Sequence, residues 1–559
     1  MPGTVNCASE EPISKVVCAR LVVGFIILGV VLRLVRYLLN YPMWCDETML
    51  AANLLDRPWT ALAQPLAYRQ VCPLGFLALE WIVVQLIGFS ELSLRLIPVV
   101  CAIVSVPLFC CLARRVLGDR TCATVLAVAI FAVSEPPIRY AAEVKPYSAD
   151  LLVSLLLLYL AVAWLQSQGQ VRLLCALAAA MPLVVSTSLP SIFVIGAIAI
   201  VGLVEVRIRF SYKLAASYMG FVGAAGLAMG CMAALGQYHA AAEDRNYLIN
   251  FWIGAFPPSW RDPAALGGWL VRAHTGPLFA YPHGANRLAW LTVLIFGFFI
   301  WGIVLEARRN LKIFLLLVLP FLLVLAAAAL RRYPYGMSVR VAQFLVPSTL
   351  LLAAVGLGRV CMRARRLTLG RWAIPALTVV LAAMGFGRLG HDLVAPYRTP
   401  WDRTARDFAR WFWDELSVDA ELVCVRTDLG IPLRPEPWTY DAADQYLCLQ
   451  RIYSRRHQQK RPPDWNKISA DRPLRCVLLN RMPTDVPAFL NWIETHRDRY
   501  RLRDVRTYPA SRGARAEPAQ TYVVCEFAPT ASLHNESRGG NKRTHIEGRT
   551  AVGKSDTMR

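Results

Sequence analysis

Two adjacent carboxylic acids, Asp46 and Glu47, stand in the stretch MWCDETML, just after the first long apolar run. A carboxylate at the edge of a membrane can serve as a general base that accepts a proton from a nucleophile. Asp46 could instead cap a helix that starts near Glu47, where acids also suit the positive end of the helix. Capping needs only one acid, so this stretch alone leaves both interpretations open.

A second group of acids lies in the stretch EPPIRYAAEVKPYSADLL. Glu143 is the preferred functional acid here and Asp150 the second choice. Pro146 indicates the start of the next helix. If helical order continued from Glu143, spacings of four and three residues would place Glu143, Tyr147 and Asp150 on one face. The alternative is a solvated loop followed by an Asp in the first turn of a helix.

Basic residues gather in a third stretch, LRRYPYGMSVRVAQFLVP, where Arg331 and Arg340 bracket a short loop. Guanidinium groups are well shaped to bind phosphate through paired hydrogen bonds. Arg69 and Lys145, which also lie near helix ends, could join such a site. The alternative is that these side chains extend from helix ends into water. Acids and bases at one membrane face would together bind an anion and remove a proton.

Composition places the chain among membrane proteins. Of its 559 residues 56% are hydrophobic and 18% charged, and the mean hydropathy is +0.41. The apolar residues come in blocks of about twenty, the length of a helix that crosses about 30 Å of hydrocarbon. We predict a polytopic α-helical membrane protein with about eleven transmembrane helices plus interfacial helices. The blocks are 16–39, 93–113, 121–138, 149–166, 172–188, 189–206, 214–236, 288–305, 312–330, 341–360 and 372–390.

Basic clusters between alternate pairs of blocks indicate the orientation. The positive-inside rule places all of them in the cytoplasm, so the chain after His391 lies outside. The apolar segment 73–89 would reverse this parity if it crossed the membrane. Because it is short and contains Glu80 and Gln85, we interpret it as an interfacial or shallowly inserted helix. The clusters are 113–120, 206–213, 306–312 and 359–371.

The chain divides into three predicted parts: a transmembrane module over 1–390, an extracytoplasmic α/β domain over 391–528 and a disordered polar tail over 529–559. In the second part, β-branched runs such as AELVCVRTDLG and TYVVCEFAP alternate with an amphipathic helical pattern. The tail has almost no apolar residues that could form a core.

The net charge of +22 does not indicate nucleic-acid binding. From His391 onward there are 28 Lys and Arg against 22 Asp and Glu, so most of the surplus belongs to the membrane module. Its place in short loops between helices is typical of a topology signal. His239, His274 and His283 are spread over one loop and there is no CxxC motif. We therefore predict no cofactor and no divalent metal requirement.

The three stretches together resemble the GT-C glycosyltransferases, above all the lipid A aminoarabinose transferases and the protein O-mannosyltransferases. The stretch WCDET, the turn from Arg69 to Pro73 and the following apolar helix are similar to the first external loop of that family. YAAEVKPYSADLL is similar to the second loop, and RYPYGMSVRVAQFLVP to a late loop that bears a donor-phosphate ligand. The likeness covers roughly residues 16–390, and its most specific element is the Asp-Glu pair.

The resemblance implies a GT-C fold and transfer of one sugar from a polyprenyl-phosphate donor to a lipid, glycan or protein acceptor. The reaction would take place at the outer face of the plasma (inner) membrane, among membrane lipid. Asp46 is carried over as the catalytic acid, with Glu47 beside it and Glu143 in the second loop. Inversion at the sugar follows if Asp46 acts as base. The donor phosphate would be bound by four basic residues: Arg340, Lys145, Arg69 and Arg331.

Two other classes of function remain open. A secondary transporter would place ionisable groups and broken helices near the bilayer midplane, usually in two repeated halves. An envelope scaffold without catalysis would use the outer α/β domain for binding. Asp46→Asn distinguishes them, because it should abolish transfer in an enzyme and alter uptake into vesicles in a transporter.

Overall fold

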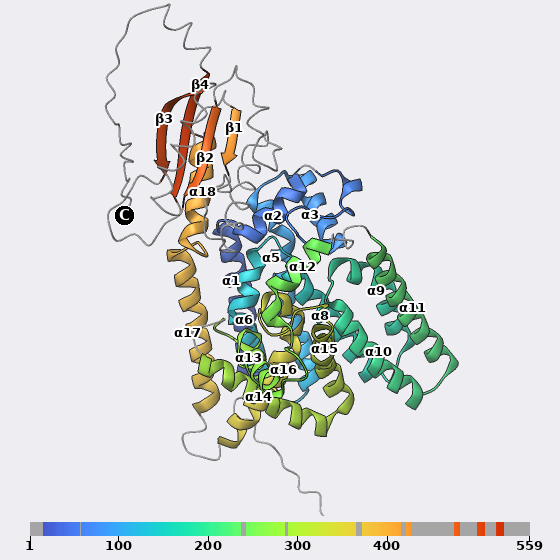
Figure 1. The fold of residues 1–559 in the computed structure, drawn as a ribbon. Coiled ribbons are helices and arrows are strands. Elements are labelled where there is room, and N and C mark those ends of the chain that lie inside the picture. Colours follow the sequence, from blue (N-terminus) through green and yellow to red (C-terminus); the bar gives the residue numbers. More distant parts are fainter. Residues whose placement is uncertain are drawn as a thin grey trace, which may run out of the picture. The chain divides into compact units, whose positions relative to one another are not determined.

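The computed structural model describes residues 15–55, 57–235, 242–284, 289–364, 372–414, 421–425, 474–480, 500–508 and 521–529 (Figure 1). The α-helices are α1 Lys15–Leu38, α2 Cys45–Leu55, α3 Leu74–Ile87, α4 Glu91–Leu94, α5 Leu96–Leu117, α6 Thr121–Val133, α7 Glu135–Arg139, α8 Tyr147–Gln166, α9 Val171–Thr187, α10 Ser191–Ile208, α11 Tyr212–Ala234, α12 Ala242–Phe251, α13 Pro263–His274, α14 Ala289–Arg309, α15 Leu311–Ala329, α16 Val346–Ala364, α17 Ala373–Val394 and α18 Pro400–Asp414. Short 3-10 helices are η1 Trp59–Ala61, η2 Tyr140–Ala142, η4 Ile253–Ala255, η5 Pro277–Phe279 and η6 Arg340–Leu345. The strands are β1 Glu421–Val425, β2 Leu474–Asn480, β3 Tyr500–Tyr508 and β4 Thr521–Pro529.

Contacts divide the chain into two compact units. The helical unit comprises residues 1–41 and 57–396, and the C-terminal unit comprises 42–56 and 397–559. The short segment 42–56 holds α2 and with it the Asp-Glu pair. Sequence reasoning had placed that segment in the membrane module, and its contacts group it with the C-terminal residues instead.

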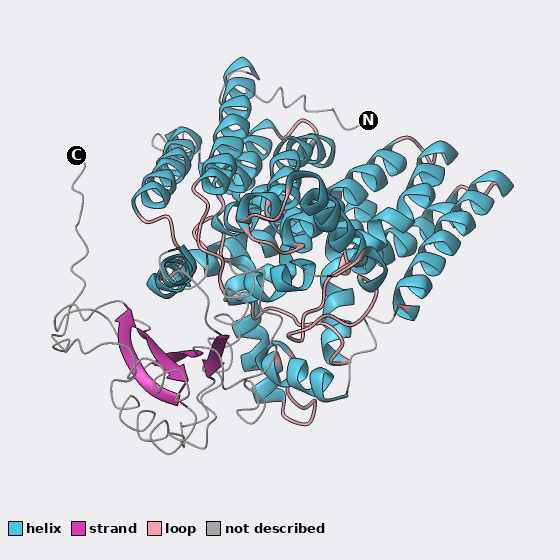
Figure 2. Cartoon of the chain, turned by 90° about the horizontal axis from the view of Figure 1, so that it is seen from above, coloured by secondary structure: helices cyan, strands magenta, loops and turns pink. Residues whose placement is uncertain are grey.

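The helical unit contains the predicted membrane spans. Among the described residues nine helices are long and apolar enough to cross a membrane, and α6 with α7 and η2 forms a tenth, bent candidate. The eleventh predicted block corresponds to α9, which at 17 residues is shorter than any of the nine. Each of the eleven predicted blocks is therefore helical. Figure 2 shows these helices partly end-on, and Figure 1 shows α9, α10 and α11 on one side of the unit and α17 on the other. The chain is an integral membrane protein.

Segment 73–89 is a helix, as expected, with α3 covering 14 residues. At about 1.5 Å per residue such a helix is too short to cross the bilayer upright. Gly75 allows α3 to approach α9 closely, because a Cβ there would lie 2.6 Å from Ser186 Oγ. The interfacial position of α3 remains a prediction.

The break between α6 and α7 has a local cause, because Pro136 and Pro137 at the start of α7 have no N–H to donate to the carbonyls four residues earlier. The helix bends by 46° there, which leaves backbone carbonyls without their helical partners. Arg33 on α1 is fully buried and its guanidinium donates to the carbonyls of Ala132, at 3.1 Å, and Phe131, at 3.4 Å. A charged group inside the bundle therefore stabilises the bend that brings α7 back toward the helix ends.

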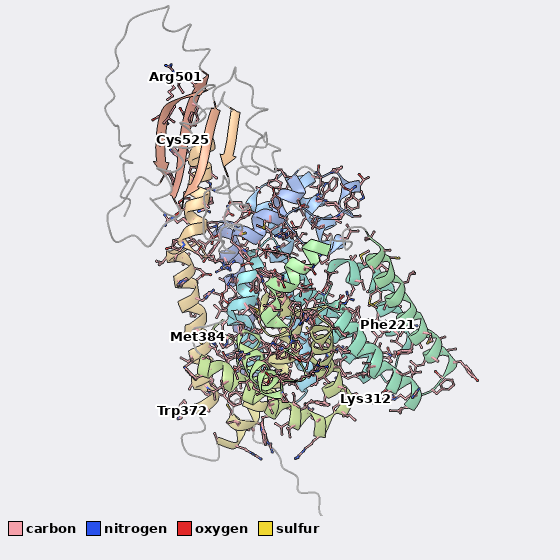
Figure 3. All side chains as sticks on the ribbon, in the orientation of Figure 1. Phe221, Lys312, Trp372, Met384, Arg501 and Cys525 are labelled. Carbon is pink, nitrogen blue, oxygen red and sulfur yellow. The ribbon has the colours of Figure 1, made fainter. Side chains whose placement is uncertain are left out.

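Ion pairs join the basic loops at one end of the helical unit. Arg120 Nη1 lies 2.8 Å from Glu306 Oε2. Lys312, labelled in Figure 3, pairs with the buried Glu205. Three of the four basic clusters therefore lie together, and Trp372 beside the fourth lies at the same end (Figure 3). This arrangement agrees with the prediction that all four basic clusters lie on the same side of the membrane. That this side is cytoplasmic remains a prediction.

The described part of the C-terminal unit contains a four-stranded sheet with the order β1-β2-β4-β3. β1 and β2 are parallel, and β4 pairs antiparallel with both β2 and β3. The Tyr508 ring at the end of β3 packs against Phe408 and Trp411 of α18. The predicted strands are present, and the segment predicted as an amphipathic helix, AFLNWIETHR (488–497), lies outside the described residues. The predicted polar tail lies outside the described residues, apart from Pro529 at the end of β4.

Candidate functional site

The Asp-Glu pair occupies the first turn of α2 in the C-terminal unit. Glu47 is buried, and its Oε2 accepts a hydrogen bond from the backbone N–H of Trp44 at 3.3 Å. Trp44 immediately precedes the helix, so Glu47 is the residue that reaches back to the N-terminal amide, as in one half of a capping box. The alternative in which Asp46 caps a helix from Glu47 is therefore corrected, because α2 begins two residues earlier, at Cys45, and Asp46 is its second residue.

Trp44 also contacts the chain beyond α17. The guanidinium carbon of Arg398 lies 3.7 Å from the Trp44 ring centre, within the same compact unit. Arg398 and Glu47 therefore both hold the residue from which α2 begins. Asp46 is partly exposed at the second position of that helix.

The second-loop acids do not share a helical face. η2 ends at Ala142, and Glu143 has extended backbone angles, φ −121° and ψ 136°. Helical order resumes only at Tyr147, with Pro146 at the N-cap as predicted. The expected alignment of Glu143, Tyr147 and Asp150 is wrong because the extended residue and the proline interrupt the helix.

Glu143 and Lys145 are both buried, each about 5% exposed, in the turn between η2 and α8. Glu143 Oε1 accepts from Arg139 Nε at 3.0 Å, and the other carboxylate oxygen is buried without a hydrogen-bond partner among the described residues. Lys145 Nζ donates to Gln70 Oε1 at 2.5 Å. The turn therefore presents a buried ammonium group, tied to the first external loop, beside a carboxylate only half satisfied by hydrogen bonds.

Two of the predicted phosphate ligands meet on one helix. The guanidinium carbon of Arg69 lies 4.0 Å from the ring centre of Tyr247 on α12. Arg340, at the start of η6, lies 5.0 Å from the ring centre of Trp252, the residue that follows α12. The rings of Tyr247 and Phe251 stack at a centroid distance of 6.4 Å, which makes the aromatic surface continuous. Two loops far apart in sequence therefore bring their guanidiniums to the same aromatic surface.

Arg340 also belongs to the surroundings of the second loop. η6, which begins with Arg340, is joined to α8 by the hydrogen bond that Ser154 Oγ donates to Phe344 O at 2.6 Å. Within the helical unit Arg139 and Glu143 flank η2, Lys145 follows in the turn before α8, and the segment that begins with Arg340 packs on α8. Figure 1 shows α3 and α12 at the end of this unit opposite the basic clusters.

The other predicted residues are placed differently. Arg331 is exposed at the end of α15, in a left-handed conformation with φ +54°. Asp150 is buried in the first turn of α8, and its Oδ1 has no hydrogen-bond partner among the described residues. Asp46 and Glu47 belong to the other compact unit, so their approach to Glu143, Lys145 and Arg340 remains a prediction.

His274 is a structural residue. Its Nδ1 lies 2.8 Å from Leu270 O and its Nε2 lies 3.0 Å from the Tyr335 hydroxyl, inside an aromatic cluster. Burial there lowers its pKa, which favours the neutral ring. Across the described ranges no group of three His, Cys, Asp or Glu side chains could hold a metal ion. The prediction that the reaction needs no metal is not tested by this arrangement.

Sequence reasoning did not assign the residues that support these groups. Arg139 and Gln70 were not among the predicted site residues. The aromatic residues of α12 had a visible signal, since the loop around them is rich in Trp, Tyr and Pro. That signal did not reveal their partners, because Arg69 and Arg340 come from other loops.

No known family model matches this sequence, and no curated protein matches it. Comparison with solved structures defines the fold as that of the GT-C glycosyltransferases. The similar structures include ArnT from Cupriavidus metallidurans bound to undecaprenyl phosphate, with 14% identity and a TM-score of 0.52 over 90% of this chain and 97% of that chain. The apo state of the same protein gives 14% identity and a TM-score of 0.53 over 90% and 98%. An oligosaccharyltransferase from Archaeoglobus fulgidus gives 12% identity and a TM-score of 0.43 over 78% and 63%.

The GT-C fold predicted from three short stretches is therefore confirmed. At this level of identity the comparison defines the fold, and the reaction has to be argued from the site.

Proposed function

We propose that the chain is an inverting glycosyltransferase that moves a single sugar from a polyprenyl-phosphate donor to an acceptor hydroxyl at the outer face of the membrane. The observation that carries the proposal is the convergence of Arg69 and Arg340 on the aromatic surface of α12 and Trp252, together with the buried Glu143 and Lys145 in the turn before α8. Guanidinium and ammonium groups collected at one end of a membrane bundle suit a lipid phosphate. The similar ArnT structure holds undecaprenyl phosphate, a ligand of that chemistry.

In this mechanism Asp46 acts as general base. It accepts the proton of the acceptor hydroxyl while the hydroxyl oxygen attacks the anomeric carbon from the face opposite the phosphate. The bond between that carbon and the phosphate oxygen breaks, and its electron pair leaves with the lipid phosphate. Attack from the opposite face inverts the anomeric centre. Glu47 fixes the start of α2 and so the position of Asp46.

Arg340, Lys145 and Arg69 stabilise the departing phosphate. Positive groups already in place cost no reorganisation when charge develops on the leaving oxygen. Because three cationic side chains supply that charge, the mechanism does not call for a divalent metal. The half-satisfied carboxylate of Glu143 orients Arg139 and contributes a hydrogen-bond acceptor to the acceptor substrate. The acceptor class, whether lipid, glycan or protein, is left to experiment.

The test uses the purified full chain in liposomes with a radiolabelled sugar on undecaprenyl phosphate. Lipid, glycan and protein fractions of a cell envelope serve as separate acceptors. We expect transfer by the natural protein and a loss of about 10²- to 10⁴-fold in Asp46→Asn, the range typical of a general base. Asp262→Asn is the matched control, because Asp262 is an acid that caps α13.

Full turnover by Asp46→Asn would overturn the assignment of the base. A natural protein that consumes no donor with any acceptor fraction would overturn the proposed function. Retention of the anomeric configuration in the product would contradict the single-displacement mechanism.

A further inference from the structure

Four charged side chains form a network between α1, α7 and α17. Arg388 Nη2 lies 2.8 Å from Glu135 Oε1. Arg388 Nε also lies 3.6 Å from Asp392 Oδ1, and Asp392 Oδ2 lies 2.9 Å from Arg36 Nη1. The Arg36 and Asp392 side chains are nearly buried, at 7% and 5% exposed. Breaking a pair that is removed from water leaves a charge uncompensated, so such a network fixes the helices that carry it.

Glu135 is also constrained from other directions. Its backbone N–H donates to Pro282 O at 2.8 Å. Gly284, with φ +84°, brings its backbone so close that a Cβ there would lie 2.6 Å from Glu135 Oε2. The loop around Pro282 and the Arg388 guanidinium therefore enclose the Glu135 carboxylate and determine where α7 begins.

The residues that follow Glu135 form one short, hydrogen-bonded piece. Arg139 closes α7 and binds Glu143 at 3.0 Å. Ser148 Oγ in α8 donates to Tyr140 O at 2.9 Å, and Lys145 N–H donates to Glu143 O at 2.7 Å. A displacement of α7 at its first residue would therefore move the carboxylate and the ammonium group of the candidate site together.

We propose that Glu135 and Arg388 are positioning residues whose ion pair sets the location of the turn that carries Glu143 and Lys145. The inference rests on the proposed function, because it treats that turn as part of a lipid-phosphate site. Neither residue touches the reacting groups. Their role is to hold α7 against α17, which ends at Val394, shortly before the C-terminal unit begins at Tyr397.

A second ion pair in the chain serves as a matched control, because its role should be structural only. Arg120 and Glu306 lie 2.8 Å apart, with Glu306 buried, at the end of the helical unit that carries the basic clusters. Loss of that pair should destabilise the protein and leave the turn at Glu143 and Lys145 in place. Comparison of the two pairs therefore separates positioning of the site from general stability.

The experiment measures binding of undecaprenyl phosphate to the purified full chain in nanodiscs, together with thermal unfolding. The variants are Glu135→Gln, Arg388→Gln, the double variant, Arg388→Lys and Arg120→Gln. We expect about tenfold weaker binding in each single Gln variant, equivalent to about 1.4 kcal/mol. The double variant should be no more than about twofold weaker than either single one, because the two changes remove the same contact. Arg388→Lys should recover part of the affinity.

Arg120→Gln should bind as the natural protein does, even where its melting temperature falls as far as that of Arg388→Gln. Unchanged binding in Glu135→Gln and Arg388→Gln, with a lower melting temperature, would reduce the pair to a structural role and overturn the inference. If a Gln variant does not fold, Arg388→Lys decides the question, since full affinity there together with a lower melting temperature would show that a weakened pair leaves the site in place and would overturn the inference. A natural protein that binds no undecaprenyl phosphate would instead overturn the proposed function itself.

Discussion

Arg340 places its guanidinium carbon 5.0 Å from the ring centre of Trp252, directly after α12. An aromatic face attracts a cation and holds it in one plane without neutralising it. Arg69 is held in the same way by Tyr247, one helical turn before Phe251. The aromatic surface of α12 and Trp252 therefore orients two guanidiniums that come from loops far apart in sequence.

The first prediction concerns Arg340. Arg340→Ala should weaken binding of undecaprenyl phosphate about tenfold or more, since a hydrogen bond to a charged group contributes about 1.5–3 kcal/mol. The affinity of Arg340→Lys should lie between those of Arg340→Ala and the natural protein, because lysine keeps the charge and loses the planar guanidinium. Titration of the purified variants in nanodiscs measures the affinities. Arg261→Ala removes an exposed arginine before α13 and is the control; equal affinities in Arg261→Ala and Arg340→Ala would contradict the assignment.

A second prediction separates the two acids of α2. Glu47 accepts from the N-terminal amide, so Glu47→Ala should lower the free energy of unfolding by about 1 kcal/mol, the usual value of a cap. Asp46→Ala should leave the melting temperature close to that of the natural protein while it removes sugar transfer. Thermal unfolding in detergent and the transfer assay give the two readouts. Equal destabilisation by both changes would assign capping to Asp46 and weaken its role as base.

The membrane helices could be predicted because their signal is local. A run of about twenty apolar residues is read directly from the chain, and each of the eleven blocks is helical. The break after Val133 has a local signal in Pro136 and Pro137, but local patterns do not show that Arg33 of a different helix donates to the carbonyls freed there. At Glu143 the sequence left two possibilities open, a continued helix and a loop, and the extended conformation of Glu143 agrees with the loop.

The candidate site could be predicted only in part. Residue type and position at helix ends indicated Glu143, Lys145, Arg69 and Arg340. Their partners could not be found from local patterns, because Gln70 lies one loop before Lys145 and α12 lies between Arg69 and Arg340 in sequence. Periodicity reports which face of an element is buried, and it carries no information about which loops meet.

Glu80 gives a prediction of pH dependence. Both of its carboxylate oxygens are buried without a hydrogen-bond partner among the described residues, and burial holds its pKa well above the usual value. The folded chain then binds the proton more tightly than the unfolded chain. Stability is therefore lost as pH rises from the ordinary pKa of about 4.3 toward the raised value.

Glu80→Gln should remove this loss because a neutral amide replaces the acid. The variant should gain stability relative to the natural protein as pH rises from about 4 toward 8, the window above the ordinary pKa of Glu. Melting temperatures across that range provide the measurement. Asp119→Asn, which removes an exposed acid, is the control. Parallel curves for Glu80→Gln and the natural protein would show that Glu80 is solvated or paired.

The last prediction concerns the contact between α14 and α16. A Cβ at Gly302 would lie 1.8 Å from Leu352 O, and one at Gly356 would lie 2.1 Å from Phe298 O, so the two helix backbones touch through both glycines. Small residues permit such close approach between membrane helices. Gly302→Ala should therefore force the helices apart and destabilise the protein by about 1–3 kcal/mol, as overpacking does. Gly297→Ala on the same helix has no atom within 4 Å of its new Cβ and should be neutral or stabilising.

These two variants also test the link between packing and the site. η6, which begins with Arg340, continues directly into α16, so a displaced α16 moves the guanidinium that faces Trp252. Gly302→Ala should therefore weaken undecaprenyl phosphate binding as well as lower the melting temperature, and Gly297→Ala should do neither. Equal melting temperatures for the two variants would mean that α14 and α16 do not touch at Gly302. A destabilised Gly302→Ala with full affinity would mean that η6 is held in place by contacts other than α16.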